Sequence, residues 1–210
     1  TSKNFLFSIA NSLIVATATV GFSLLLGVTA SYALARVRFR GRGLLLMTIL
    51  AVSMFPQIAV LAGLFELVRF LGIFNTHWAM ILSYTIFTLP FTVWVLTTFM
   101  RDLPVEIEEA AIIQDIPWIK RMTRIIIPIQ KSSIISGYML PFMTCLRELS
   151  LFMLLCVQGF ILSTTLDYFD EMGLYAFSSG INLILIITIL VCNTLVNKVT
   201  GASLDKGIGG

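Results

Sequence analysis

Long apolar runs alternate with short polar connections along the whole 210-residue chain. Five runs are long enough to cross a bilayer as helices, which takes about 20 residues each. They cover residues 5–35, 44–70, 78–100, 132–157 and 181–199. A spanning segment has no water to satisfy its backbone, so each run is predicted to be one helix. The pattern predicts an all-α membrane helix bundle forming a single domain, residues 1–210, with the polar connection 101–131 outside the bilayer.

Composition supports a membrane protein and excludes an ordinary soluble domain. Hydrophobic residues make up 58% of the chain and charged residues only 12%, with a mean hydropathy of +0.96. A soluble domain carries about 25% charged residues. The three cysteines, Cys145, Cys156 and Cys192, lie in apolar runs without metal-ligand spacing, and His77 is the only histidine. We therefore expect neither a disulfide nor a metal site.

The placement of Lys and Arg predicts the orientation. Positive side chains gather within residues 36–42, within 101–131 and after the last run, whereas the connections 71–77 and 158–180 contain no Lys or Arg. Positive charge marks the cytoplasmic side of a membrane protein. We expect the N-terminus outside, and the 101–131 connection and the C-terminus in the cytoplasm. The arginines at 36–42 are interpreted as a topology anchor rather than a nucleic-acid or specific lipid site.

A short helix is predicted inside the 101–131 connection. Asp102-Leu103-Pro104 is a helix-start signal. Three acids then lie near the positive end of the helix dipole, namely Glu106, Glu108 and Glu109. Ala110 and Ala111 follow, which favour a helix and leave its surface almost bare. Such a helix fits closely into a groove on another protein, although the same pattern is also typical of a membrane-surface helix.

The residues of this connection resemble the EAA loop of ABC-importer permeases, the membrane subunits that a separate ATPase drives. Glu109-Ala110-Ala111, Ile125 and Pro128 occupy the offsets of the family motif. The resemblance implies a coupling helix that docks into a cleft of the ATPase, with Glu109, Ala110 and Ala111 as contacts. Glu108, Asp115 and Pro128 belong to the same coupling loop.

Position 115 departs from the family pattern. The family usually has glycine where this chain has Asp115. Glycine permits a turn with positive φ, and aspartate tolerates such a turn better than most residues, at some cost.

The resemblance divides between two subfamilies. Residues 11–111 resemble the carbohydrate permeases of the maltose type, through runs such as Ser31-Tyr32-Ala33-Leu34-Ala35-Arg36 and Leu71-Gly72-Ile73-Phe74-Asn75-Thr76. The C-terminal part, with Leu146-Arg147-Glu148-Leu149-Ser150, is more similar to the ferric-iron type. A sugar or oligosaccharide is the favoured substrate, and ferric iron is the alternative.

Five residues inside the predicted spans are candidates for a translocation path, namely Pro56, Pro90, Pro141, Arg147 and Glu148. Proline kinks a helix and frees carbonyls that must find other partners. A charge within a span costs roughly 2.5–3.5 kcal/mol on insertion scales and usually faces a bundle interior or a wet cavity. The same residues would serve equally to fix helix packing.

The resemblance implies the permease subunit of an ATP-driven importer in a bacterial or archaeal cytoplasmic membrane. Its implied partners are a cytoplasmic ATPase dimer, a second permease subunit and an extracytoplasmic binding protein, besides the bilayer; no nucleic acid is implied. Without a GxxxxGK[ST] loop, the chain should bind no cofactor and not be an enzyme, because the partner would use the ATP. The sugar permeases commonly have one more span ahead of this core.

Two hypotheses from other classes remain open. An ion-coupled secondary transporter would require acidic relays within the membrane and inverted repeats. The sequence has Glu148 as its one central acid, and five spans do not divide into two matching halves. A membrane scaffold that transports nothing would bind no ATPase.

Overall fold

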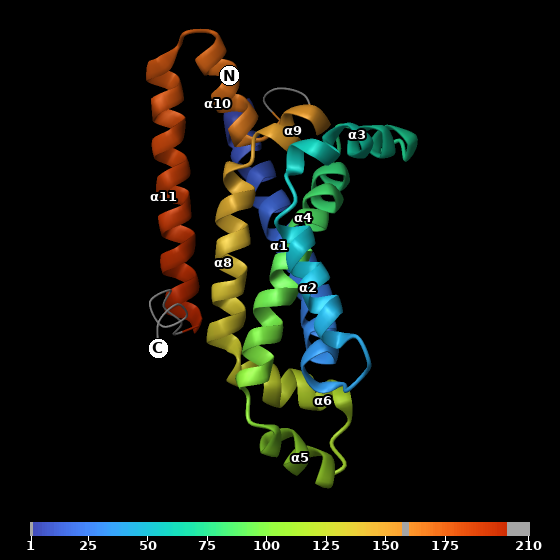
Figure 1. Cartoon of the computed structure of the whole chain (residues 1–210). Helices are drawn as coiled ribbons and strands as arrows, with labels where there is room; N and C mark the ends of the chain where they lie inside the picture. The colour runs from blue at the N-terminus through green and yellow to red at the C-terminus, as the bar shows by residue number, and fades with distance from the viewer. Residues whose placement is uncertain (1, 157–159, 201–210) are drawn as a thin grey trace.

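A computed structural model describes residues 2–156 and 160–200, and within these ranges every regular element is a helix (Figure 1). The prediction of an all-α bundle is confirmed. In chain order the elements are α1 (Ser2–Arg36), α2 (Arg42–Ser53), η1 (Gln57–Val60), α3 (Leu61–Phe70), α4 (His77–Asp102), α5 (Val105–Ile113), α6 (Trp118–Arg121), η2 (Met122–Ile126), α7 (Ile127–Ile129), α8 (Lys131–Arg147), α9 (Ser150–Leu155), α10 (Leu162–Glu171) and α11 (Tyr175–Thr200).

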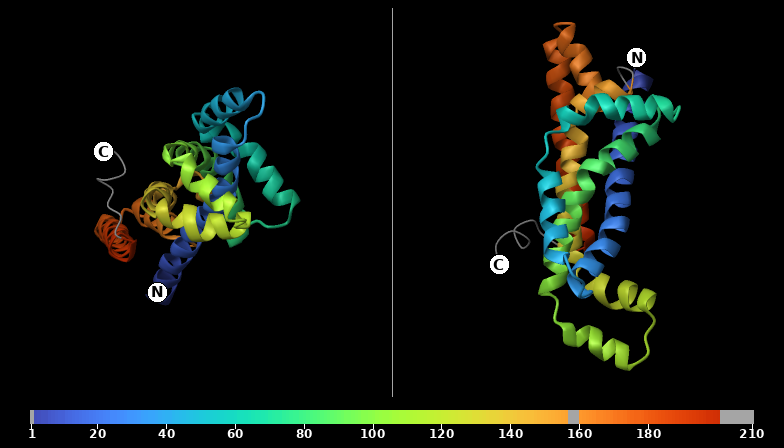
Figure 2. Two further views of the ribbon diagram at one scale, coloured as in Figure 1. Left: turned by 90° about the horizontal axis from the view of Figure 1, so that it is seen from below. Right: turned by 45° about the vertical axis from the view of Figure 1, so that its right-hand side comes forward.

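The long helices run along the molecule and define two ends (Figures 1 and 2). Helix α4 packs against α1, α2 and α8, while α11 packs against α8 and α10. Helices α5 and α6 lie beyond the bundle at one end, here called the loop end. At the opposite end, here called the N-terminal end, α3 lies across the bundle beside α9.

Three helices among the described residues are long and apolar enough to cross a membrane, over Phe5–Arg36, His77–Asp102 and Tyr175–Leu195. A fourth crossing exists if the bent pair Arg42–Ser53 and Gln57–Phe70 forms one broken span, with an angle of 91° between its parts. The prediction of a single helix over 44–70, kinked at Pro56, is therefore wrong, because the helix is broken there. Pro56 adopts an extended backbone with ψ of 121°. Because proline lacks an N–H and disfavours a helical residue before it, the chain breaks there.

The predicted helix over 132–157 is also interrupted. Helix α8 ends at Arg147, and Glu148 takes an extended ψ of 127° before α9 begins at Ser150. The Leu151 N–H donates to Glu148 Oε1 at 3.2 Å, so this carboxylate satisfies a free donor at the start of α9. Residue 157 lies outside the described residues.

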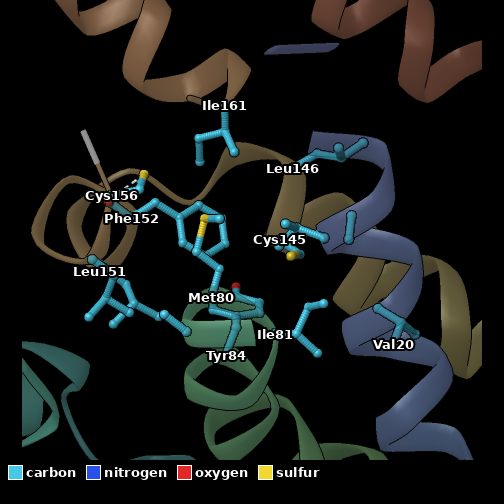
Figure 3. Packing of buried hydrophobic residues seen from close by; sticks show 14 of the residues in the cluster. Val20, Met80, Ile81, Tyr84, Cys145, Leu146, Leu151, Phe152, Cys156 and Ile161 are labelled. Carbon is cyan, nitrogen blue, oxygen red and sulfur yellow. Dashed lines mark hydrogen bonds between the residues drawn. The ribbon is translucent and has the colours of Figure 1, made fainter. Parts of the chain in front are cut away.

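The main core lies where α1, α4, α8 and α9 meet (Figure 3). Tyr84 and Phe152 pack with ring centroids 5.7 Å apart and are almost fully buried. Towards the middle of the bundle the hydroxyls of Ser23 and Thr88 are hydrogen-bonded at 2.7 Å. A Cβ on Gly27 would meet Thr92 Cγ2 at 3.0 Å. Small residues allow this close approach, so α1 and α4 form a tightly packed pair that extends towards both ends.

Candidate functional site

Helix α5 forms where the sequence predicts a short helix. Pro104 is its N-cap residue, and Glu106 and Glu108 occupy the first turn, where the helix dipole favours carboxylates. Two residues beyond its end, Asp115 has a φ of 50°, so the expected turn with positive φ is confirmed at this position. Pro117 then precedes α6 and supplies the fixed φ that suits a helix start.

The two faces of α5 have different environments. Glu108 and Ala111 are buried, at 5% and 4% exposure, whereas Glu109 and Ala110 are exposed. Adjacent helical residues point about 100° apart, so neighbours in sequence can face opposite environments. The predicted contact set is thus divided: Ala111 packs against its own chain, and Glu109 and Ala110 face outwards.

Arg36, the last residue of α1, holds Glu108. Its Nε donates to Glu108 Oε1 at 2.6 Å, and its Nη2 donates to the Leu103 carbonyl at 2.8 Å. Only 12% of the Arg36 side chain and 7% of the Glu108 side chain are exposed. Charge-assisted hydrogen bonds of this kind are about twice as strong as neutral ones. One guanidinium therefore joins α1, the end of α4 and α5.

Tyr32 extends this contact from one turn earlier on α1. Its hydroxyl donates to Glu108 Oε2 at 3.0 Å and accepts from Arg121 Nη2 at 3.2 Å. The ring packs edge-on against Trp118, with centroids 5.9 Å apart. Tyr32, Arg36, Glu108 and Arg121 form what we call the polar clamp. It connects α1 to α5 and to α6.

Sequence reasoning missed the polar clamp. It interpreted Arg36 as a topology anchor and used Tyr32 only as part of a family resemblance. One signal was available, because residues four apart lie on the same face of a helix, which places Tyr32 and Arg36 together. Their partner Glu108 is 72 residues beyond Arg36, and only the fold brings it close.

The loop rests on a second apolar cluster. Met100, Leu103, Met122 and Ile126 are buried together, and Ile107 of α5 packs against them. Gln130, at the start of α8, donates from Nε2 to the Phe99 carbonyl at 2.7 Å. The chain therefore returns to the bundle beside the point where it left. The remaining loop candidate, Pro128, lies in α7 and is exposed.

Large apolar side chains remain exposed on α5 at the loop end. Ile112 and Ile113 are 54% and 82% exposed, beside Glu109 and Ala110. We call these four residues the docking face. Apolar patches of this kind outside a bundle mark binding surfaces.

The other predicted candidates are not brought together with the loop. Arg147 is exposed at the end of α8, and Glu148 lies at the α8–α9 break. There the Glu148 carbonyl accepts from Ser163 Oγ at 2.7 Å. Pro90 and Pro141 lie within α4 and α8, which remain helical through them.

A mainly apolar groove of about 720 Å³ lies between the bent α2–α3 pair and α4, next to Pro56. Its polar and aromatic lining residues are Thr48, Ser53, Phe55, Gln57 and Phe87.

Comparisons with known proteins agree with this architecture. The sequence model of a family described as "Binding-protein-dependent transport system inner membrane component" matches residues 23–203. The trehalose/maltose transport system permease protein MalG of Thermococcus litoralis is 35% identical over 138 residues, 66% of this chain and 50% of the relative. The trehalose transport system permease protein SugB of Mycobacterium tuberculosis is 31% identical over 147 residues, 70% of this chain and 54% of the relative. The chain thus spans about half the length of these curated relatives.

A solved structure shares the fold. A bacterial ABC transporter involved in the import of the acidic polysaccharide alginate contains a chain that matches with a TM-score of 0.77. The match covers 93% of this chain and 75% of that chain, at 20% sequence identity.

Proposed function

The chain belongs to the family of binding-protein-dependent transport system inner membrane components, and we propose that it is the permease subunit of an ATP-driven ABC importer. The docking face carries this proposal. Its exposed Glu109, Ala110, Ile112 and Ile113 lie on a helix held rigidly outside the bundle. A largely apolar helix face that carries one acid fits a groove on a soluble partner, which in this family would be the ATPase.

The transport cycle follows from a bundle with two states. Closure of a pair of ATPase subunits would displace α5, and the bundle would switch from a cavity open to the cytoplasm to one open outside. Such a switch needs only that the docked partner binds one state better than the other. The chain supplies the path and a second permease subunit completes it. The ATP is bound and hydrolysed by the partner, and this chain holds no cofactor.

The proposed orientation places the loop end in the cytoplasm and the N-terminus outside, in a multi-pass inner-membrane protein. Its support is the Lys and Arg content of the connections together with the positions of the ends. Residues 101–131 carry the loop-end charges, while the start of α1 lies at the opposite end (Figure 1). A substrate-binding protein would then deliver its cargo at the N-terminal end.

The proposed substrate is a sugar or oligosaccharide. The relatives above are named for trehalose and maltose, which favours a sugar over ferric iron. The groove supports the same choice, since it offers Phe55 and Phe87 beside the polar side chains of Ser53 and Gln57. Sugars bind through aromatic faces and hydrogen bonds, whereas an iron path would use acidic oxygens.

Purification of the tagged chain from its native membrane in mild detergent, with mass spectrometry of the proteins retained, tests the ATPase partner. We expect the wild-type chain to retain an ATPase that Glu109→Lys loses. The matched control is Asp170→Lys, the same charge reversal at an exposed site on α10. The importer proposal fails if the wild type retains no ATPase under conditions that hold a known importer together. If Asp170→Lys loses the ATPase to the same extent, the docking face is not the surface that binds the ATPase.

Uptake into cells that express the complete transporter tests the substrate. We expect labelled trehalose or maltose to enter, and ferric iron uptake to equal that of cells lacking the chain. Iron uptake that depends on the chain would reverse the proposal.

A further inference from the structure

Two side chains of α1 contact the loop at its exit, at its first helix and at its second helix. Arg36 contacts the Leu103 carbonyl and Glu108, and Tyr32 contacts Glu108 and Arg121. We propose that the polar clamp makes α1 the helix that receives the displacement of α5 during transport. Tyr32 and Arg36 are then positioning residues for coupling. This inference rests on the proposed function of an ATP-driven permease.

The covalent connection between α4 and α5 is poorly suited to passing on a push. Leu103 and Pro104 are extended, with ψ of 127° and 132°, so no helical hydrogen bonds continue through them. A connection of two extended residues is a hinge, because rotation there breaks no regular structure. Arg36 bridges this hinge, since it binds Leu103 on one side and Glu108 on the other.

Burial makes the bridge stiff. The ion pair is almost fully removed from water, and hydrogen bonds strengthen in such surroundings. Separating Arg36 from Glu108 would leave two unpaired charges in a nearly dry site, which is strongly unfavourable. Pivoting α5 away from α1 is therefore opposed, and α5 and α1 move together.

The partner does not need to touch the clamp. Glu108 and Ala111 face inwards, whereas Glu109 and Ala110 face outwards. A force on the docking face acts on one side of α5 and is passed through the helix to the carboxylate on the other side. Two adjacent glutamates thus have separate roles, with Glu109 towards the partner and Glu108 towards α1.

The movement continues from α1 to α4 through their tight contact. Gly27 lies close against Thr92, and Ser23 is hydrogen-bonded to Thr88. Close-packed helices shift as rigid bodies rather than deform continuously. The clamp therefore drives the α1–α4 pair, and α4 lines the groove through Ile86 and Phe87.

The test measures the distance between α5 and α1 in the assembled transporter. Spin labels are placed at Val105→Cys on α5, outside the docking face, and at Leu25→Cys on α1, both exposed, after the three natural cysteines are replaced by alanine. Labelled chain is diluted with unlabelled chain so that only distances within one chain contribute. Distances are measured by pulsed electron–electron double resonance in nanodiscs, once without nucleotide and once with Mg-ATP plus orthovanadate, which traps the closed ATPase.

We expect a single narrow distance that is the same in both states for the wild-type clamp. Arg36→Gln should broaden the distribution and shift its mean when ATP and vanadate are added. Arg40→Gln, which removes an exposed arginine of the same connection, should behave as the wild type. Tyr32→Phe keeps the ring against Trp118 and removes only the hydroxyl, so it provides a milder break that should broaden the distribution less.

The inference is overturned if the wild-type distance itself changes between the two states. It is equally overturned if Arg36→Gln and Tyr32→Phe both retain the narrow, unchanged distance. Retention of the ATPase is measured on the same samples. If the wild type retains no ATPase, the proposed function fails, and the nucleotide-free widths of wild type and variants decide whether the clamp holds α5 to α1. If ATPase is retained and both variants keep the narrow, unchanged distance, the proposed function stands and only the clamp is wrong.

Discussion

The two ends of the bundle are held together by different chemistry. At the loop end, one buried guanidinium binds a carboxylate and a carbonyl. At the N-terminal end, several amide and hydroxyl hydrogen bonds share the task. Asn11 Nδ2 donates to the Phe160 carbonyl at 2.8 Å, Ser12 Oγ accepts from the Leu162 N–H at 2.7 Å, and Thr165 Oγ1 donates to Ser8 Oγ at 3.2 Å.

Because of this difference, the loop end is suited to passing on a movement, whereas the N-terminal end is suited to holding the helices together. A buried ion pair is directional and fails as a whole when one member is lost. A set of neutral hydrogen bonds contributes about 1 kcal/mol each and weakens stepwise. The loop end therefore behaves as one rigid joint, while the N-terminal end is a distributed attachment that tolerates single losses. The tight contact between α1 and α4 connects the two.

Breaking the ion pair should have the largest effect. Glu108→Ala leaves Arg36 buried without its carboxylate, so we expect the free energy of unfolding to fall by about 3–5 kcal/mol. Unfolding is followed by circular dichroism during titration of SDS into mixed micelles. The matched control Glu106→Ala removes an exposed acid from the same first turn and should stay within about 0.5 kcal/mol of the wild type.

Replacing both members sharpens this result. Arg36→Met with Glu108→Leu removes the two charges together, and such a change to apolar residues is often close to neutral. We therefore expect most of the lost stability to return. If the double variant is as unstable as Glu108→Ala, the loss does not come from an unpaired buried charge.

A substitution in the contact between α1 and α4, which joins the two ends, should have the next largest effect. Gly27→Val places branched carbons against Thr92 and Leu96, where even a Cβ would lie at 3.0 and 3.4 Å. Overpacking of this kind costs about 1–3 kcal/mol. Gly21→Val on the same helix has no other atom within 4 Å of its Cβ and should cost clearly less in the same SDS titration. Equal costs would show that α1 and α4 can separate without penalty.

The distributed attachment predicts a smaller loss. Asn11→Ala removes the bond to the Phe160 carbonyl and the 3.0 Å contact with His77 Nε2, for an expected cost of about 1–2 kcal/mol. Asn182→Ala, at an exposed site on α11, is the control. A loss as large as that of Glu108→Ala would contradict the contrast between the ends.

Much of this architecture could be predicted from the sequence, for reasons that particular residues make clear. Apolar length alone identifies α1, α4 and α11, and the run from Asp102 to Ala111 carries the local signals of a short helix. The break at Pro56 was predicted only as a kink, because hydropathy continues across it. Proline favours an extended conformation in the residue before it, but the continuous hydropathy across Pro56 outweighed this signal.

Long-range pairing could not be predicted. Arg36 is one of four arginines between residues 36 and 42, and each would serve equally well as a topology anchor. The choice of Arg36 depends on how α1 ends beside α5, which no local pattern records. In the same way, Glu108 and Glu109 are adjacent residues of the same type. Only the burial of Glu108 and the exposure of Glu109 assign the first to the clamp and the second to the docking face.

The smallest expected effect concerns the turn that ends α5. Asp115 has a φ of 50°, a region in which an L-residue is strained and glycine is not. Asp115→Gly removes that strain but makes the unfolded chain more flexible. The net expectation is a gain of about 0.5 kcal/mol. Gln114→Gly, at a φ of −85°, has no such strain to lose and should cost about 0.5–1 kcal/mol.

The test is whether the two neighbouring substitutions change the free energy of unfolding in opposite directions. If both destabilise equally in the SDS titration, position 115 is not strained and the turn is held by something other than its backbone. A gain at position 115 alone would show that the loop end retains some strain while the clamp fixes α5. Since the clamp contacts α5 at Glu108, before this turn, the gain should persist in the Arg36→Met and Glu108→Leu double variant.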